Sequence, residues 1–264
     1  QSVEQSAVNS PSLNAIGLTN CRNSLFERLH TLQHILGRED FVALLHRQGR
    51  MHPMLSDYVN KSFYNSQLDI IPLEHQTGSL EFSKHDNDEW STFVAKTRIG
   101  MIDVTDTEDV TTNNKSNKKE AEVVVDLIAT LYKLYNDNGL TPEIGKRIGV
   151  IVPFRAQIAM IKNLLAETAL PDATDITIDT VERYQGSQRD IILFSSTIKQ
   201  YYQLAILSEP ILTDGIWIDR KLNVAITRGR KQFSLVGNGS LLQKCPAYKD
   251  FIDYIYRQDG IFKR

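Results

Sequence analysis

Short, continuous apolar segments alternate with helical segments through most of the chain, and this alternation limits its possible folds more than any other feature. We expect strands at residues 99–104, 148–152, 175–179, 190–196 and 232–238. We expect helices over residues 120–135, 155–167, 221–229 and 248–258. Strands that are apolar throughout are buried on both faces, as in parallel sheets that helices cover on either side. The sequence therefore predicts an α/β fold built on a parallel sheet.

The residues outside this alternation predict two more helices and two less regular stretches. Ser24 is a suitable cap for an amphipathic helix over 24–36, and a short helix is expected to begin near Pro53. Residues 69–98 lack a regular apolar period, which indicates an insertion or surface excursion. We interpret residues 1–47 as an N-terminal segment and helix leading into a single domain, with residues 1–264 as its bounds.

Local capping signals also mark the start of the helix at 120–135. The loop before it, 105–120, is almost wholly polar. Asn117 stands three residues before Glu120, which is the spacing of a capping box. We therefore expect the helix to begin directly after Asn117.

Composition and charge exclude several classes of protein. Hydrophobic residues make up 41% and charged residues 23%, as in ordinary globular proteins, and the formal net charge is −2. A chain with so little net charge has no extended basic coat, so any site for a polyanion must be local. No segment approaches the roughly 20 apolar residues needed to cross a bilayer, so no membrane partner is expected. The N-terminus lacks the features of a signal peptide and reads like a cut made inside a longer protein.

The cysteines and histidines predict neither a disulfide framework nor a metal site. Cys21 and Cys245 lie far apart, which favours a reducing, cytoplasmic location. His30 and His34 are four residues apart, but no glutamate follows His30 and no third ligand is evident. We therefore expect no bound metal held by histidine or cysteine.

The arginines of residues 221–231, KLNVAITRGRK, suit a phosphate group, although a solvated helix end is the simpler interpretation. The chain has no phosphate-binding loop of its own. Its nearest approach, GLTPEIGK at 139–146, has its glycines six apart and is followed by Arg147 instead of Ser or Thr. Arginines without a phosphate loop make sense if another domain carries the nucleotide and this one supplies arginines across the interface.

Four segments, in order, resemble the second RecA-like domain of superfamily 1 helicases of the up-frameshift type. They are QGRMHP at 48–53, IGVIVPFRAQ at 148–157, TIDTVERYQGSQRDIILFS at 177–195 and KLNVAITRGR at 221–230. SLFERL at 24–29 also resembles the helix that usually precedes them. The resemblance covers most of the chain and leaves 69–98 and 200–219 as regions that vary in the family.

The resemblance implies a RecA-like, P-loop-NTPase-like sheet that lacks its own P-loop. It also implies the C-terminal motor half of an ATP-dependent helicase, whose upstream RecA-like domain holds most of the ATP and Mg²⁺. By position, Arg50 and Arg228 resemble the two arginines that reach the γ-phosphate; pairing with a carboxylate or with solvent is the alternative for Arg230. The implied nucleotide contacts are Gln48, Gln185, Gly186 and Gln188. The implied contacts to single-stranded DNA or RNA are Pro153, Phe154, Arg155 and Thr180.

Several of these assignments have an alternative. The ring of Phe154 could lie in the core instead, and Gln157, a further candidate for contact with the strand, could simply cap the helix that follows. Gly49 stands where the family has a tyrosine that packs on adenine, Gln188 replaces a glutamate near the ribose, and Gly229 replaces an alanine beside Arg228. Gly49 and Gln188 favour a second hypothesis, a degenerate helicase module that serves as a protein-binding platform. A small-molecule enzyme of Rossmann type, the third hypothesis, would need a glycine-rich turn that the sequence lacks.

Overall fold

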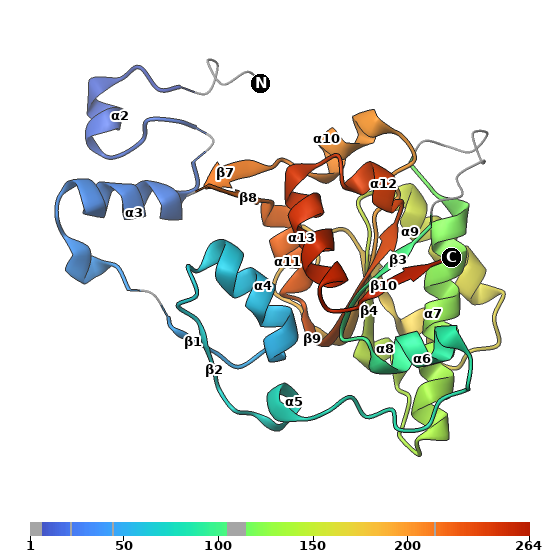
Figure 1. Cartoon of the computed structure of the whole chain (residues 1–264). Coiled ribbons are helices and arrows are strands. Elements are labelled where there is room, and N and C mark those ends of the chain that lie inside the picture. Colours follow the sequence, from blue (N-terminus) through green and yellow to red (C-terminus); the bar gives the residue numbers. More distant parts are fainter. Residues whose placement is uncertain (1–6, 22, 44, 105–114, 214) are drawn as a thin grey trace. The chain divides into compact units, whose positions relative to one another are not determined.

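A six-stranded parallel sheet organises the larger part of the molecule (Figure 1). The computed structural model describes residues 7–21, 23–43, 45–104, 115–213 and 215–264, so most of the expected loop at 105–120 lies outside the described residues. The chain divides into two compact units, and the boundary in the sequence lies between His46 and Arg47. All six strands of the sheet belong to the second unit.

The strand order of the sheet is β10-β3-β9-β6-β4-β5, and every neighbouring pair is parallel. The strands are β3 (Ile99–Asp103), β4 (Ile148–Ile151), β5 (Thr177–Asp179), β6 (Arg189–Ser195), β9 (Gly229–Gly237) and β10 (Ile261–Lys263). The five strands expected from the sequence are all present, and the predicted parallel α/β fold is confirmed. Because all strands run the same way, they end at one edge of the sheet, the carboxyl edge, and begin at the opposite one, the amino edge.

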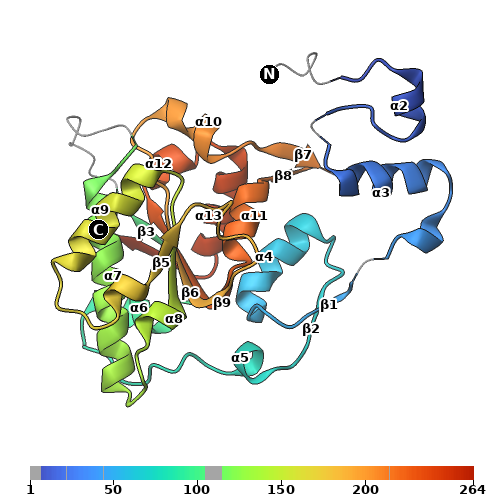
Figure 2. The same ribbon diagram turned by 180° about the vertical axis from the view of Figure 1, so that it is seen from behind.

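Helices cover both faces of the sheet, as Figures 1 and 2 show from opposite sides. The first face carries α4 (Pro53–Phe63), α11 (Arg220–Ile226) and α13 (Pro246–Tyr256), and the second carries α6 (Glu89–Lys96), α7 (Lys118–Asp137) and α9 (Arg155–Ala166). Alternate residues of β6 serve the two faces: Ile192 and Phe194 join the core of the first, and Ile191 and Leu193 that of the second. A strand buried on both sides must be apolar throughout, which explains the continuous apolar runs.

Short elements connect these layers. They are β1 (Arg47–Gln48), β2 (Asp69–Ile70), α5 (Glu74–Thr77), α8 (Ile144–Arg147), η2 (Ala173–Asp175), η3 (Tyr201–Gln203), α10 (Leu204–Leu207), β7 (Ile211–Thr213), β8 (Ile216–Ile218) and α12 (Gly239–Leu242). The strands β1 and β2 pair in parallel, and β7 and β8 form an antiparallel hairpin. The described residues of the variable region, 200–213 and 215–219, thus form a structured excursion from the carboxyl end of β6.

Residues 69–98 are more regular than their sequence indicates. They contain β2, α5 and α6, and α6 buries Val94 and Ala95 in the core beside α7. The indole nitrogen of Trp90 also donates to the hydroxyl of Thr130 at 2.9 Å. An eight-residue helix is too short for its apolar period to stand out, so this element was not predicted.

The smaller unit contains α2 (Pro11–Ala15), α3 (Leu25–Ile35) and η1 (Glu39–Phe41). The Ser24 hydroxyl accepts from the Glu27 backbone N–H at 3.1 Å, and the Glu27 carboxylate accepts from the Ser24 N–H at 2.9 Å. This capping box confirms the predicted start of the helix at Ser24. None of the helices in the described residues is both long and apolar enough to span a membrane.

Candidate functional site

Two predicted arginines, far apart in sequence, lie together at the amino edge of the sheet. Arg228 directly precedes β9, Gln188 directly precedes β6, and Arg50 lies between β1 and α4. Arg50 Nε donates to Gln188 Oε1 at 3.0 Å, and its Nη1 donates to the Thr227 carbonyl at 3.3 Å. We call Arg50 and Arg228 the arginine pair.

Within the described part of the chain, both members of the arginine pair are charged groups without an anionic partner. Arg228 Nε donates to the Val224 carbonyl at 3.1 Å, and its Nη1 donates to the Ser187 carbonyl at 3.4 Å. Among the described residues, no carboxylate forms an ion pair with either guanidinium. Burial, and then the nearby charge of Arg50, lower the pKa of Arg228. Two like charges held by neutral acceptors form a local positive field that suits a multiply charged anion such as a phosphate.

The loop that carries Arg50 is held by side-chain amides. Gln48 Oε1 accepts from the backbone N–H groups of Arg50 and Met51 at 2.9 and 2.8 Å, and Gln48 Nε2 donates to the Met51 carbonyl at 2.9 Å. A ring nitrogen of His75 lies 3.0 Å from the Arg50 carbonyl. Gln48, predicted to contact the nucleotide, therefore shapes the loop that presents Arg50; its contact with a nucleotide stays a prediction.

Arg228 is placed by the end of α11 and the start of β9. The helix ends at Ile226, earlier than the expected 229, and Gly229 is the first residue of β9. A Cβ on Gly229 would lie 2.9 Å from the Gln232 carbonyl, so even alanine would require the backbone to shift. The pairing of β6 with β9 also changes register between Arg189 and Ile191, beside the arginine pair. Such irregularities change the direction of nearby side chains. This one lies next to Arg228, in the segment between α11 and β9.

The loop from Thr180 to Gln188 crosses from the carboxyl edge to the amino edge. Its anchor is Tyr184, which is 1% exposed and donates from its hydroxyl to the Thr177 carbonyl at 3.1 Å. Gly186 has a φ of +90° with open space around it, so glycine serves the backbone conformation there. The side chain of Gln185 is exposed beside it. Both residues are accessible to a ligand, and their contact with a nucleotide stays a prediction.

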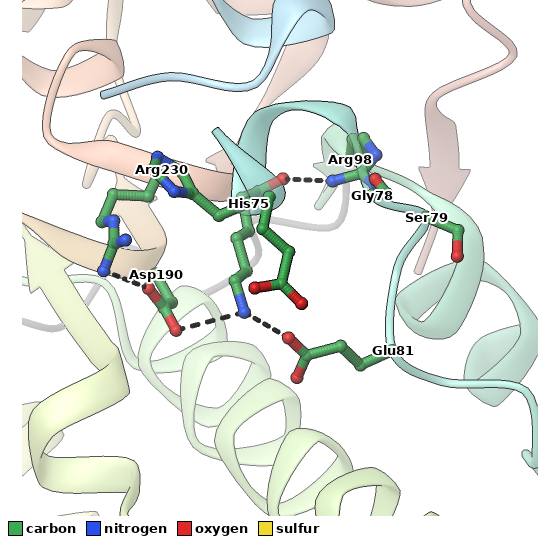
Figure 3. A pocket seen from close by; sticks show the side chains of 9 residues that line it. His75, Gly78, Ser79, Glu81, Arg98, Asp190 and Arg230 are labelled. Carbon is green, nitrogen blue, oxygen red and sulfur yellow. Dashed lines mark hydrogen bonds and ion pairs between the residues drawn. The ribbon is translucent and has the colours of Figure 1, made fainter. Parts of the chain in front are cut away.

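Arg230 belongs to a different environment (Figure 3). Its Nη1 lies 3.2 Å from Asp190 Oδ1, and Lys231 reaches both Asp190, at 3.6 Å, and Glu81. These groups line a pocket of about 410 Å³, whose remaining described lining is Glu74, His75, Gly78, Ser79 and Arg98. The guanidinium group of Arg98 donates to the backbone carbonyls of Gly78 and Lys231. Arg230 is thus the carboxylate-paired arginine of the motif, unlike Arg228.

The predicted strand contacts lie at the opposite, carboxyl edge. Pro153 to Arg155 follow β4, and Thr180 follows the neighbouring strand β5. Arg155 is exposed. Phe154 is only 8% exposed, so its ring lies in the core, which was the alternative to a contact with the strand. The carboxyl-edge rule for parallel sheets thus locates these residues, but it does not locate the arginine pair.

A buried polar network supports this carboxyl edge, and the sequence only hinted at it. Glu120 accepts from the Ser195 hydroxyl at 2.7 Å, the Ser196 hydroxyl at 3.2 Å and the Thr197 N–H at 2.7 Å. Fully buried Gln157 binds the backbone of Asn117 through both of its side-chain atoms, at 2.8 and 3.0 Å. Both predictions for Gln157 are therefore wrong: it does not cap α9, and it is too buried to contact a strand. Asn117 caps α7 as predicted, with its Oδ1 3.1 Å from the Glu120 N–H.

The sheet, its two helical layers and the arginine pair define a RecA-like α/β domain. Residues 21–240 match the family model AAA_12, described as an AAA domain, and the chain belongs to this family, as a superfamily 1 helicase domain of the up-frameshift type.

Three curated relatives carry helicase or transcript-regulator names. "DNA polymerase alpha-associated DNA helicase A" of Saccharomyces cerevisiae is 29% identical over 243 residues, 86% of this chain and 31% of that protein. "Helicase sen1" of Schizosaccharomyces pombe is 30% identical over 217 residues, 80% of this chain and 12% of that protein. "Regulator of nonsense transcripts 1 homolog" of Arabidopsis thaliana is 29% identical over 239 residues, 88% of this chain and 17% of that protein. The chain therefore spans less than a third of each relative.

Proposed function

We propose that the chain is the C-terminal motor half of an ATP-dependent helicase that moves along single-stranded nucleic acid. The arginine pair carries this proposal, because two guanidinium groups lie together at the amino edge and, among the residues that the structure describes, donate to neutral acceptors alone. Fixed cations of this kind stabilise the charge that spreads over a phosphoryl group during transfer. Arg50 and Arg228 are its proposed catalytic residues.

The proposal assigns ATP and Mg²⁺ mainly to an upstream RecA-like domain of the same polypeptide. The sequence has no P-loop, so this chain alone would not hold a nucleotide tightly or hydrolyse it. Gln185, Gly186 and Gln188 would line the near side of the cleft between the two domains. Closure of that cleft would bring the arginine pair to the γ-phosphate.

The same proposal assigns the single strand to the carboxyl edge. Arg155 would bind a phosphate, and Pro153 and Thr180 would contact the backbone or sugar. Because the 180–188 loop joins this edge to the amino edge, a nucleotide-dependent shift of the loop would reach both sites. The names of the relatives include a DNA helicase and a regulator of transcripts, so we propose a single strand of DNA or RNA.

The neutral side chain at position 188 bears on the second hypothesis, the protein-binding platform. A glutamate there would face the Arg50 guanidinium and offset its charge, whereas Gln188 accepts a hydrogen bond and leaves the charge intact. The departure from the family pattern therefore keeps a hydrogen bond that positions Arg50, and this supports the motor over the platform.

The test is single-strand-stimulated ATP hydrolysis by the chain joined to its upstream domain. Replacing Arg228 or Arg50 by alanine should reduce turnover by about a thousandfold, since each removes a cation from the transition state. The matched control is Arg257→Ala, an exposed arginine at the end of α13, which should leave turnover within about twofold of the parent. Unchanged turnover in both variants, or none in the parent, would support the platform instead.

A further inference from the structure

A groove at the carboxyl edge has no role in the function proposed above. Its volume is about 250 Å³, and it lies between the segment after β6 and the segment after α12. Its described lining is Tyr201, Tyr202, Leu204, Ala205, Ser208, Pro210, Lys244, Cys245 and Pro246. Tyr201 is 64% and Tyr202 53% exposed, so two adjacent aromatic rings face solvent at its mouth. Exposed apolar groups gathered in this way mark a binding surface.

The charge of the groove restricts what it can bind. Lys244 is the one charged residue among the nine described residues that line it. Its Nζ lies 5.7 Å from the centre of the Tyr201 ring. Aromatic rings beside a lysine suit a ligand that offers flat π-faces and negative charge together, as a single-stranded nucleic acid does.

The backbone under the two tyrosines is fixed by buried polar groups. Gln203 is 1% exposed, and its Oε1 accepts from the N–H groups of Lys199 and Gln200 at 2.8 and 2.7 Å. Beneath the groove, Asp219, which is 2% exposed, accepts through its Oδ2 from the hydroxyl of the lining residue Ser208 at 2.8 Å. The rings therefore extend from a rigid base, which reduces the entropy lost when a ligand binds.

The position of the groove gives the direction of a strand path. At the carboxyl edge, β5 is followed by Thr180, β4 by Arg155, β6 by the segment with Tyr201, and β9 by the segment with Lys244. The four strands are neighbours in this order, so the four residues follow one another across the sheet. Both ribbon views place α10 and α12 together at this end of the sheet (Figures 1 and 2). We propose that the groove is a base-stacking site, which extends the single-strand path from Arg155 across the sheet to Tyr201, Tyr202 and Lys244. This inference rests on the proposed function and adds a substrate site to it.

The experiment measures binding of the 264-residue chain to a fluorescein-labelled strand of about 20 deoxythymidines or uridines by fluorescence anisotropy. Replacing Tyr201 and Tyr202 together by alanine should weaken binding at least about tenfold, because stacked bases lose their rings. The Tyr201→Phe, Tyr202→Phe double variant keeps the rings and should bind within about twofold of the parent. For Lys244→Ala, the slope of the logarithm of the binding constant against the logarithm of the salt concentration should become shallower by about one unit, as expected for the loss of one phosphate contact.

Two further variants separate the inference from the function on which it rests. Tyr256→Ala removes a ring that is 72% exposed at the end of α13 and should not change binding. Arg155→Ala removes a proposed phosphate contact outside the groove and should weaken binding. A loss with Arg155→Ala, but none with the tyrosine-to-alanine pair, would overturn the inference, keep the strand at the carboxyl edge and leave the groove to a protein partner. A parent chain that binds neither strand would overturn the inference together with the strand site of the proposed function.

A photochemical measurement locates the contact directly. When a strand that carries 5-iodouridine is irradiated, the C–I bond of the base breaks, a new bond forms to an aromatic ring lying against it, and HI is lost. Peptide mapping should place the cross-links at Tyr201 or Tyr202 and not at Tyr256. Cross-links confined to other segments would overturn the inference even if the variants bound weakly.

Discussion

Glu120 shows, at the scale of single residues, how the carboxyl edge is held in shape. Its carboxyl group is fully buried and lies among donors from two segments, the end of β6 and the cap of α7. One of these donors, Thr197, has a φ of +62°, which a threonine rarely adopts. The glutamate therefore stabilises a strained backbone next to the proposed strand path.

Burial raises the pKa of Glu120 from 4.5 to about 7. Between these values the folded protein holds a proton that the unfolded chain has lost, so this group makes folding more favourable as the pH falls from 7 to 4.5. In the Glu120→Gln variant this contribution is absent. The free energy of unfolding of the parent, minus that of the variant, should therefore increase as the pH falls through this range.

Urea denaturation at several pH values between 4.5 and 7 measures the difference. His52, whose pKa is lowered to about 4 by burial and by Arg98, opposes the trend, because it favours unfolding as the pH falls. It is present in both proteins, so its contribution cancels. A difference that did not vary with pH would show that Glu120 is not protonated in the folded protein within this range.

The sequence identified the arginine pair through resemblance, but not the contacts that place it. Arg50 and Gln188 are separated by 138 residues, and no local pattern predicts a hydrogen bond across that distance. The resemblance predicted the amide of Gln48 as a nucleotide contact. Its second role, in folding the loop that carries Arg50, is visible only in three dimensions. Glu120 carried a weak signal, a charged residue in the first turn of an otherwise apolar helical face.

At the scale of elements, α11 connects the two edges of the sheet. Its N-cap is Asp219, whose carboxylate accepts from the Leu222 N–H at 2.6 Å, from the Ser208 hydroxyl and from the Glu209 N–H at 3.0 Å. The helix ends at Ile226, two residues before Arg228. The same helix is therefore tied to the lining of the aromatic groove at one end and leads to an arginine of the pair at the other.

Replacing Asp219 by alanine should destabilise the protein by about 2–3 kcal/mol, because a helix cap and two further hydrogen bonds of a buried carboxylate are lost. Urea denaturation measures the change. The control is Lys61→Ala, which removes an exposed pair with Asp57 four residues earlier in α4 and should cost no more than about 0.5 kcal/mol. A loss below 1 kcal/mol for Asp219→Ala would contradict the role given to it.

Elements that carry a clear apolar run or period were predicted from the sequence, even three-residue β5, and most elements without one were not. The strands β3, β4, β5, β6 and β9 and the helices α3, α7, α9 and α13 each carry enough apolar residues to show their period or continuity. By contrast, β10 has three residues and exists because it pairs with β3. The hairpin of β7 and β8 and the short helix α10 likewise depend on tertiary contacts, so 200–219 looked like a plain loop.

At the scale of the whole molecule, the sheet separates two proposed sites. The sequence predicted a parallel sheet, but not the strand order β10-β3-β9-β6-β4-β5, because order depends on which distant strands pair. The common strand direction places the arginine pair at the amino edge and Arg155, Thr180 and the aromatic groove at the carboxyl edge, and the order makes the residues of each group neighbours. A protein that converts nucleotide hydrolysis into movement along a strand needs two such sites, linked by a loop and a helix that reach both.

The central claim is that the arginine pair acts on the transition state of ATP hydrolysis more than on ATP binding. The most direct test compares two affinities of the Arg228→Ala variant, in the chain joined to its upstream domain. We predict that its affinity for ADP with aluminium fluoride, which mimics the phosphoryl group in flight, falls at least about a hundredfold, while its affinity for ATP falls less than about fivefold. Equal losses for the two ligands, or no loss for either, would contradict the claim.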